Sequence, residues 1–524
     1  MRFVVALLCC ATFVSPVFAS KLDQLELILM HSSPVVADKP LHSTDLVRYA
    51  YQENGYDVIW QNERVISQLL SAIENSWQEG LTPSDYHFAV LKDYAKNLDA
   101  HLGDIDFDLL LTDAVMTYAT HLIRGKVNPK SLSASWNYQL YSVTPQKAAS
   151  QLLYHVKQQS IPEGLSQLKP KLPQYQKLKN LLLFFHQQPK DFKQVTLDAR
   201  ILKRNQTDNS VPVIRKRLED YRLIDKVSVE NERVYSSDLV AGIRKLQKQN
   251  QLPADGVIGK DTLKVLNITP QQHIETIKAN LERIRWVENS LDDEFLVVNI
   301  AGYELYLYQH GELTWRTNVV VGRNYTKTPV FKGQMSYLVV NPTWTVPRSI
   351  ARGIIPRVQK DISYLDKKDF MVVDSRRNPI DASTIDWQNV NRRAFPYWFV
   401  QRPSETNSLG QIKFMLPNRY SIYLHDTPAK SLFAREQRAF SHGCVRVEQP
   451  FKLAEMILND DDNWSQKALQ ETLATRETTR INLAKPLDVF LMYWTVSYNH
   501  DGLHFYPDVY GRDQKLIAKL RQPL

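Results

Sequence analysis

The chain has 524 residues, enough for about two to four domains of ordinary size. Hydrophobic residues make up 43% and charged residues 23%, which excludes a wholly disordered chain, and 17 Gly with 26 Pro exclude a collagen-like or other fibrous protein. The net charge of +9 comes from 65 basic against 56 acidic residues, so the excess is dilute and does not by itself indicate nucleic-acid binding.

The first residues have the pattern of an export signal. Arg2 precedes an apolar run, Phe3–Val14, and Pro16 then leads to small or permissive residues ending at Ala19. We expect residues 1–19 to be a signal peptide cleaved after Ala19, and we expect an exported protein with no membrane span once it is removed. An uncleaved N-terminal anchor is the alternative.

Cysteine usage singles out one residue. Cys9 and Cys10 lie in the signal segment, so the mature chain keeps Cys444 alone. A lone thiol in an oxidising compartment cannot form an internal disulfide. Cys444 is therefore buried and inert, paired with another molecule, or a reactive nucleophile. The residues around Cys444 in the sequence distinguish among these three possibilities.

The segment 20–207 has the apolar spacing of helices. Ile66, Leu69 and Ile73 recur at helical intervals, and the stretch 110–123 continues the same period. We expect a helical scaffold domain over these residues.

A small helical unit is predicted over 208–270. Leu239, Ile243 and Leu246 share one helix face, a turn follows at Asp255–Gly259, and Asp261 is placed to cap a second short helix. The arrangement resembles the peptidoglycan-binding helical module found beside many cell-wall enzymes. A helical spacer without a ligand is the alternative.

From residue 294 the apolar residues alternate, which predicts strands. The alternating runs lie at 295–300, 304–308, 317–321, 337–341 and 421–425. Between the last two, the stretch 347–415 is rich in Arg, Pro and aromatic residues. We expect an insertion in a sheet domain, serving either as a lid over a site or as a stabilising excursion.

The mature cysteine lies in the run Ser441-His442-Gly443-Cys444-Val445-Arg446. Gly443 lets the backbone before Cys444 approach a substrate closely, and a histidine with a nearby cation can lower the pKa of a thiol. Two histidines are candidates. His425 ends the predicted strand nineteen residues earlier, whereas His442 is so near in sequence that its ring need not reach the sulfur in an attacking geometry.

His425 followed by the run 441–446 resembles the active-site signature of the YkuD-type L,D-transpeptidases of bacterial cell walls. Three further segments resemble the large YcbB-type murein L,D-transpeptidases: Tyr51–Tyr56 with Trp60, Glu79–Tyr86 and Asn280–Trp286. The resemblance implies an α+β multidomain fold. It consists of a helical N-terminal scaffold, a small helical peptidoglycan-binding-like module and a mainly-β YkuD-type catalytic domain over 271–524 with a capping insertion.

The resemblance also implies a two-step acyl transfer in the periplasm. Cys444 would attack the diaminopimelate carbonyl of a tetrapeptide stem and release D-Ala. The amine of a second diaminopimelate would then resolve the thioester, giving a 3→3 cross-link, with His425 moving the protons. Backbone N–H groups near Gly443 and Cys444 would form the oxyanion site.

Further residues are assigned to the oxyanion and substrate-binding surface. They are Ser441, His442, Arg446, Tyr423 and Trp344. The group that orients His425 stays open among a backbone carbonyl, Ser441 and Asp426. No His, Cys, Asp or Glu cluster has metal-ligand spacing, and thiol acyl transfer needs no cofactor.

The expected partners are peptidoglycan stem peptides, with tetrapeptide as donor and diaminopimelate as acceptor, other wall-synthesis enzymes, and carbapenems as covalent inhibitors; nucleic acid is not expected. The residues leave two other functions open. One is an L,D-carboxypeptidase or hydrolase, because water and an amine meet the same thioester. The other is a catalytically silent scaffold protein that binds peptidoglycan through the helical module.

Overall fold

The computed structural model describes residues 21–133, 135–138, 144–226, 232–287, 293–459, 463–499 and 501–524. The predicted signal segment and its cleavage site lie outside these residues. The described residues divide into two compact units. The first takes its residues from 1–124, 143–169 and 523–524, and the second from 125–142 and 170–522.

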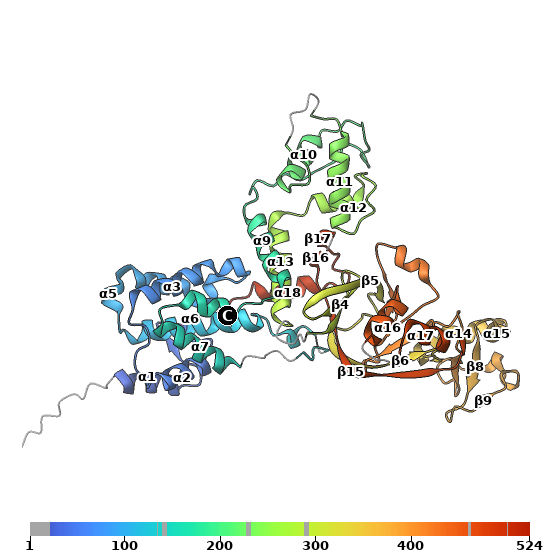
Figure 1. Cartoon of the computed structure of the whole chain (residues 1–524). Coiled ribbons are helices and arrows are strands. Elements are labelled where there is room, and N and C mark those ends of the chain that lie inside the picture. The colour runs from blue at the N-terminus through green and yellow to red at the C-terminus, as the bar shows by residue number, and fades with distance from the viewer. Residues whose placement is uncertain are drawn as a thin grey trace, which may run out of the picture. The chain divides into compact units, whose positions relative to one another are not determined.

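The first unit is helical, as expected (Figure 1). Its helices are α1 (Lys21–Met30), α2 (Thr44–Glu53), α3 (Glu63–Glu74), α4 (Phe88–Tyr94), α5 (Leu98–His101), α6 (Ile105–Arg124), α7 (Pro145–Lys157) and α8 (Ile161–Gln167). Short 3-10 turns connect α3 to α4 and α4 to α5, and two-residue strands β1 (Val35–Val36) and β2 (Lys39–Pro40) pair between α1 and α2.

Helix α6 is the central helix of this unit and is buried along most of its length. Two of its carboxylates are buried and satisfied by neighbouring segments. Asp113 accepts the Ser43 backbone N–H at 2.7 Å and contacts the His87 imidazole at 2.7 Å. Asp108 accepts the Trp60 backbone N–H at 2.8 Å. Because a buried carboxylate is costly without such partners, these bonds fix the loops that surround α6.

The predicted small module is present as α10 (Val211–Asp220), α11 (Ser237–Gln249) and α12 (Lys260–Leu266) (Figure 1). The predicted apolar face of α11 is buried in the core of the module. Gln247 holds the following turn by accepting the Gly256 N–H at 2.8 Å. The predicted cap at Asp261 is wrong: Gly259 occupies the cap position of α12, and the Asp261 carboxylate pairs with Lys264 at 3.1 Å.

The helices within the expected region 20–207 do not all belong to the first unit. Helix α9 (Pro173–His186) belongs to the second unit and packs on α13 (Pro270–Arg285). Leu182, Phe185 and Ile277 join these two helices to the core of the sheet domain. Amphipathic helices far apart in sequence therefore bury their apolar faces against each other, which the helical period alone does not indicate.

The sheet domain has nine strands in the order β13-β5-β14-β12-β11-β6-β15-β3-β4. Their bounds are β3 (Phe295–Asn299), β4 (Glu304–Gln309), β5 (Glu312–Gly322), β6 (Phe331–Val340), β11 (Ile412–Met415), β12 (Leu424–His425), β13 (Ala439–Ser441), β14 (Val445–Val447) and β15 (Thr479–Met492). Because β4 also pairs with β5, the sheet closes on itself. The remaining elements are α16 (Pro450–Leu458), α17 (Gln466–Ala474), α18 (Arg512–Leu520) and the hairpin β16 (Val496–Asn499) and β17 (Gly502–Phe505).

The predicted insertion forms a small sheet of its own, in the order β7-β10-β8-β9 (Figure 1). The strands are β7 (Trp344–Thr345), β8 (Phe370–Val373), β9 (Pro379–Ile380) and β10 (Trp398–Gln401), covered by α14 (Arg348–Lys360) and α15 (Tyr364–Lys367). Its aromatic and aliphatic residues make a separate core. The limits differ from the expected 347–415, because β7 starts the small sheet at Trp344 and β11 already belongs to the nine-stranded sheet.

The predicted fold class is confirmed: helical scaffold, helical module and β-rich catalytic-type domain with an insertion. The predicted strand at 421–425 is shorter than expected, since only Leu424 and His425 pair with neighbouring strands and Ser421 has a positive φ of 55°. Within the described ranges, no helix is both long and apolar enough to span a bilayer.

Candidate active site

The strand register gathers the candidate residues on one face of the nine-stranded sheet. Leu424 on β12 pairs with Val445 on parallel β14, and both are fully buried on the core face. Side chains alternate along strands, so Tyr423 and Cys444, one position earlier, point to the opposite face. The Val445 N–H donates to the Tyr423 carbonyl at 3.1 Å and locks this register.

The same register extends the face across three strands. His425 on β12 lies beside Arg446 on β14 and beside Lys413 on β11. Residues paired across neighbouring strands point to the same side of a sheet. His425 and Cys444, which the sequence analysis assigned to catalysis, are therefore brought together with two cationic side chains.

The loop that carries Cys444 is held by short hydrogen bonds. The Ser441 hydroxyl donates to the Cys444 carbonyl at 2.6 Å and accepts the Gly443 N–H at 3.0 Å. The Thr328 hydroxyl donates to the Gly443 carbonyl at 2.8 Å. Gly443 itself has φ +120°, a conformation that L side chains rarely adopt, so this position requires glycine.

These bonds correct one detail of the expected oxyanion site. The Gly443 N–H does not point free toward a substrate, because it donates to Ser441. The Cys444 N–H, in contrast, has no hydrogen-bond partner within the part of the chain that the structure describes. The backbone donor available for a developing oxyanion is therefore that of Cys444.

The Cys444 thiol is half-buried and lies 3.6 Å from the Ser421 carbonyl. Burial raises its pKa, because a thiolate is costly away from water. Hydrogen bonds from Tyr423 and the charges of Lys413 and Arg446 oppose that rise. The resting residue is a thiol whose ionised form has three stabilising neighbours.

His425 is buried and is oriented by the backbone. Its Nδ1 lies 2.5 Å from the Asp426 carbonyl, whereas the Asp426 carboxylate accepts the Gln411 N–H at 2.9 Å and pairs with Lys430. Ser441 is bonded to its own loop. Of the three candidates for orienting the imidazole, the backbone carbonyl is the one that contacts the ring.

The charge state of His425 follows from its surroundings. Burial, followed by the positive charge of Arg446, lowers its pKa to about 3, and the carbonyls of Asp426 and Leu409 oppose the shift. The ring is therefore neutral at neutral pH. With Nδ1 donating to the Asp426 carbonyl, the lone pair of the neutral ring lies on Nε2, which is the form a general base needs. His442, the other candidate, is exposed.

Tyr423 joins the sulfur to the insertion. Its ring contacts the His425 ring with centroids 5.6 Å apart, and its hydroxyl hydrogen-bonds Cys444. Burial and the Cys444 charge raise the pKa of Tyr423, and a hydrogen bond from Trp344 lowers it. Trp344 belongs to β7 and also packs near Phe370 of the small sheet. The insertion is thus linked to the nucleophile by hydrogen bonds through the Tyr423 hydroxyl.

Lys413 is the residue of this face that sequence analysis missed. Its Nζ lies 3.9 Å from the Tyr423 ring centroid, and burial lowers its pKa while Cys444 raises it. Neither Lys413 nor Arg446 has a carboxylate within 4 Å in the described residues, and the Arg446 Nε is buried without a partner. The sequence feature that could have identified Lys413 is the position of a lysine among the apolar residues of the short strand 412–415.

The described residues contain no group of three or more His, Cys, Asp or Glu side chains close enough to hold a metal ion. The chemistry that this face itself supplies is that of a thiol, an imidazole, a phenol and two cations.

Comparison with protein families agrees with this geometry. Residues 293–472 match the family described as the L,D-transpeptidase catalytic domain, named YkuD. Residues 293–472 therefore correspond to a YkuD-type L,D-transpeptidase catalytic domain. Residues 45–182 match a family described as a scaffold domain, and residues 207–266 match one described provisionally as a peptidoglycan binding domain.

A Haemophilus influenzae protein named provisionally as an L,D-transpeptidase is 34% identical over 256 residues, which cover 49% of this chain and 50% of the relative. The chain thus spans about half the length of that curated relative. An L,D-transpeptidase from Xylanimonas cellulosilytica is 12% identical with a TM-score of 0.17, covering 57% of this chain and 100% of that one. One from Stackebrandtia nassauensis is 13% identical with a TM-score of 0.21, covering 57% and 97%. Scores this low add nothing to the assignment.

Proposed function

We propose that this protein is an exported L,D-transpeptidase that forms 3→3 diaminopimelate cross-links through a Cys444 thioester. The observation that carries the proposal is the placement of the half-buried Cys444 sulfur on the same sheet face as a neutral, backbone-oriented His425. Support for the substrate comes from the matches to a YkuD-type catalytic domain and to a peptidoglycan-binding family.

In the acylation step, His425 Nε2 takes the Cys444 thiol proton as the sulfur attacks the L-centre carbonyl of diaminopimelate in a tetrapeptide stem. The Cys444 N–H stabilises the oxyanion. The C–N bond to the terminal D-Ala breaks, and the proton passes from His425 to the leaving amine. The product is a thioester between Cys444 and the shortened stem.

In the transfer step, the side-chain amine of a second diaminopimelate attacks the thioester carbonyl and gives a proton to His425. The C–S bond breaks, and the sulfur recovers its proton from the imidazole. Lys413 and Arg446 have two functions here. They stabilise the thiolate and, being without acidic partners, bind the carboxylates of the anionic stem.

The insertion 344–401 is proposed to cover the bound stem. Support comes from the hydrogen bond of Trp344 to Tyr423, whose hydroxyl also bonds the nucleophile. The test is a variant without the insertion. If this variant folds and keeps full activity on whole sacculi, this part of the proposal is wrong. The module 207–266 is proposed to hold the polymer near the site, and export with loss of residues 1–19 is proposed to deliver the protein to the periplasm.

The test uses the purified chain without residues 1–19 and its Cys444→Ala variant, each incubated with disaccharide-tetrapeptide and analysed by mass spectrometry. We expect dimers linked through two diaminopimelates from the unmutated protein alone. Tripeptide without dimers would identify water as the acceptor, hence a hydrolase. Equal product from both proteins would exclude Cys444 as the nucleophile.

A carbapenem supplies an independent check of the nucleophile. The strained lactam carbonyl is a substrate for an activated thiolate, so we expect a one-to-one covalent adduct on Cys444 in the intact-mass spectrum. An unmodified mass after long incubation would contradict the proposed activation of Cys444.

A further inference from the structure

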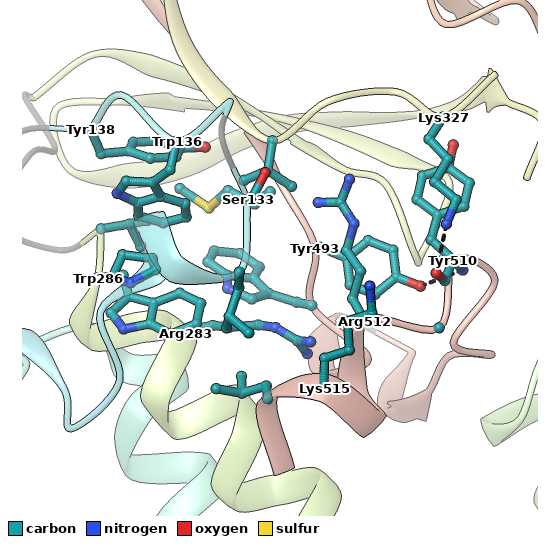
Figure 2. Close-up of a pocket in the computed structure, with 18 residues that line it drawn as sticks. Ser133, Trp136, Tyr138, Arg283, Trp286, Lys327, Tyr493, Tyr510, Arg512 and Lys515 are labelled. Carbon is teal, nitrogen blue, oxygen red and sulfur yellow. Dashed lines mark hydrogen bonds between the residues drawn. The ribbon is translucent and has the colours of Figure 1, made fainter. Parts of the chain in front are cut away.

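A cavity separate from the catalytic face lies in the larger unit, at the start of α18 and the end of β15, and neither Cys444 nor His425 lines it (Figure 2). Its volume is about 230 Å³. Pockets for drug-sized ligands usually enclose roughly 300–1,000 Å³. The space therefore suits a single ring or short side group rather than a long segment of polymer.

Aromatic side chains form much of its wall: Trp136, Trp286, Tyr138, Tyr493 and Tyr510 (Figure 2), together with Trp494. Trp136 packs on Tyr138 with centroids 4.2 Å apart and edge-on against Trp286 at 5.3 Å. Such rings present flat apolar faces on which a sugar or alkyl body packs. The Trp136 Nε1 is buried without a hydrogen-bond partner in the described residues.

Four cations also line the cavity, and they differ in how their charge is balanced. Arg283 is neutralised by Asp513 at 2.6 Å. The side-chain charges of Lys327, Arg512 and Lys515 have no carboxylate within 4 Å in the described residues, although the Arg512 backbone N–H donates to the Asp508 carboxylate at 2.8 Å. This cavity therefore concentrates positive charge that the protein itself leaves unpaired.

Arg512 is the least exposed of these unpaired cations. Its guanidinium donates to the Thr328 carbonyl at 3.3 Å and lies over the rings of Tyr493 and Tyr510, 5.2 and 5.5 Å from their centroids. Burial lowers its pKa, and Arg283 adds repulsion. A partly desolvated cation without an anion is costly, and a bound anion would offset that cost.

We propose that this cavity binds a carboxylate-bearing group of peptidoglycan, with its body against the tryptophans and its carboxylate at Arg512 and Lys515. The choice of polymer rests on the proposed function. Two sources share this chemistry: the free carboxylates of stem peptides, and the lactyl carboxylate of muramic acid from which the stem has been removed.

The cavity wall is bonded to the strands that hold the nucleophile loop. The Tyr510 hydroxyl donates to the Gly322 carbonyl at 2.6 Å and accepts the Thr328 N–H at 3.1 Å. Thr328 in turn donates to the Gly443 carbonyl at 2.8 Å. A group bound against Tyr510 thus packs on a residue that supports the loop of Cys444 without entering the catalytic face.

The test measures binding by ligand-observed NMR to the full mature chain carrying Cys444→Ala, so that no probe is consumed. The probes are N-acetylmuramic acid, the free tetrapeptide stem, and N-acetylglucosamine as a sugar without a carboxylate. Lys515→Glu reverses one exposed charge, Arg512→Gln removes the half-buried one, and Lys519→Gln changes a lysine of the same helix that does not line the cavity.

We expect saturable binding of N-acetylmuramic acid or of the tetrapeptide, weakened at least tenfold by Lys515→Glu and unchanged by Lys519→Gln. Which probe binds identifies the source of the carboxylate. Equal binding of N-acetylglucosamine, equal binding to Lys515→Glu, or no saturation of any probe up to about 10 mM would overturn the proposal. Arg512→Gln is interpreted only if its thermal midpoint matches that of the parent chain.

Turnover of disaccharide-tetrapeptide by the chain with Cys444 intact separates this inference from the proposed function. Charge-dependent binding without turnover would overturn the transpeptidase and leave the cavity as a binding site. Turnover without such binding would overturn the cavity alone.

Discussion

Two regions of the larger unit hold buried or half-buried cations and differ in how the charge of these cations is balanced. Two buried cations of α13 itself each have a counter-charge: Arg285 pairs with Glu282 at 3.2 Å and Arg283 with Asp513 at 2.6 Å. On the catalytic face, Lys413 and Arg446 have no acidic partner in the described residues. The paired charges stabilise the fold. The unpaired charges are available to interact with the anionic substrate or with the Cys444 thiolate.

The largest effect is expected on the catalytic face, from His425→Asn. Loss of the proton acceptor should lower kcat/KM for cross-linking by about 10³-fold or more, since general acid–base catalysis by one group contributes about 10²–10⁴-fold and this group acts in both steps. The measurement is initial dimer formation by mass spectrometry. A loss of less than tenfold would mean that another base serves Cys444.

The next effect should fall on stability, from Glu282→Gln. Glu282 is fully buried, and its carboxylate also accepts the Val127 N–H at 2.6 Å. Removing its charge takes from the buried Arg285 the carboxylate that lies 3.2 Å away, which should cost about 3–5 kcal/mol of unfolding free energy. Urea unfolding of the variant is the measurement.

The matched comparison for this variant is Lys413→Met, which removes a cation that has no partner. Its unfolding free energy should stay near that of the parent or rise. Equal destabilisation by Glu282→Gln and Lys413→Met would erase the distinction between the two regions.

Lys413→Met should instead change the pH dependence of thiol alkylation. The Lys413 charge favours the thiolate, so its loss raises the pKa of Cys444 and moves the profile of iodoacetamide alkylation to higher pH, by about one pH unit. Lys413→Arg keeps the charge and should restore most of the profile. A profile that is the same for Met and Arg at this position would exclude an electrostatic role.

The smallest effect is expected from Tyr423→Phe, which removes one hydroxyl and keeps the ring. Loss of the hydrogen bond to Cys444 should cost about 1 kcal/mol, or roughly fivefold in acylation rate by a carbapenem. Trp344→Phe is the companion variant, because it removes the other hydrogen bond to the same hydroxyl. A Trp344→Phe effect larger than that of Tyr423→Phe would show that the insertion acts on the site by another route.

The sequence predicted what depends on local pattern. Alternating apolar residues located β3 to β6 of the sheet domain, and the helical period located α11. These signals succeed because each reports which side of a local element is buried.

Features that depend on which elements pair in the tertiary structure could not be predicted from local sequence patterns. Lys413 joins the site only because β11 pairs with β12, and α9 packs on α13 because that helix, far along the chain, offers it an apolar face. The contact between His425 and the Asp426 carbonyl depends on backbone torsions, which have no side-chain signature. The start of the insertion at Trp344 could not be recognised from the sequence, because a strand of two residues is too short to show an alternating apolar pattern.

The closure of the nine-stranded sheet has a consequence for folding kinetics. Parallel pairing joins Phe295 on β3 to Asp488 on β15, so this contact closes a chain segment that includes the whole insertion. Contacts between distant residues carry a high loop-closure entropy and form slowly, whereas the insertion has a core built from its own short segment. The insertion should therefore gain protection from hydrogen exchange early in refolding, and the β3–β15 ladder should gain it last.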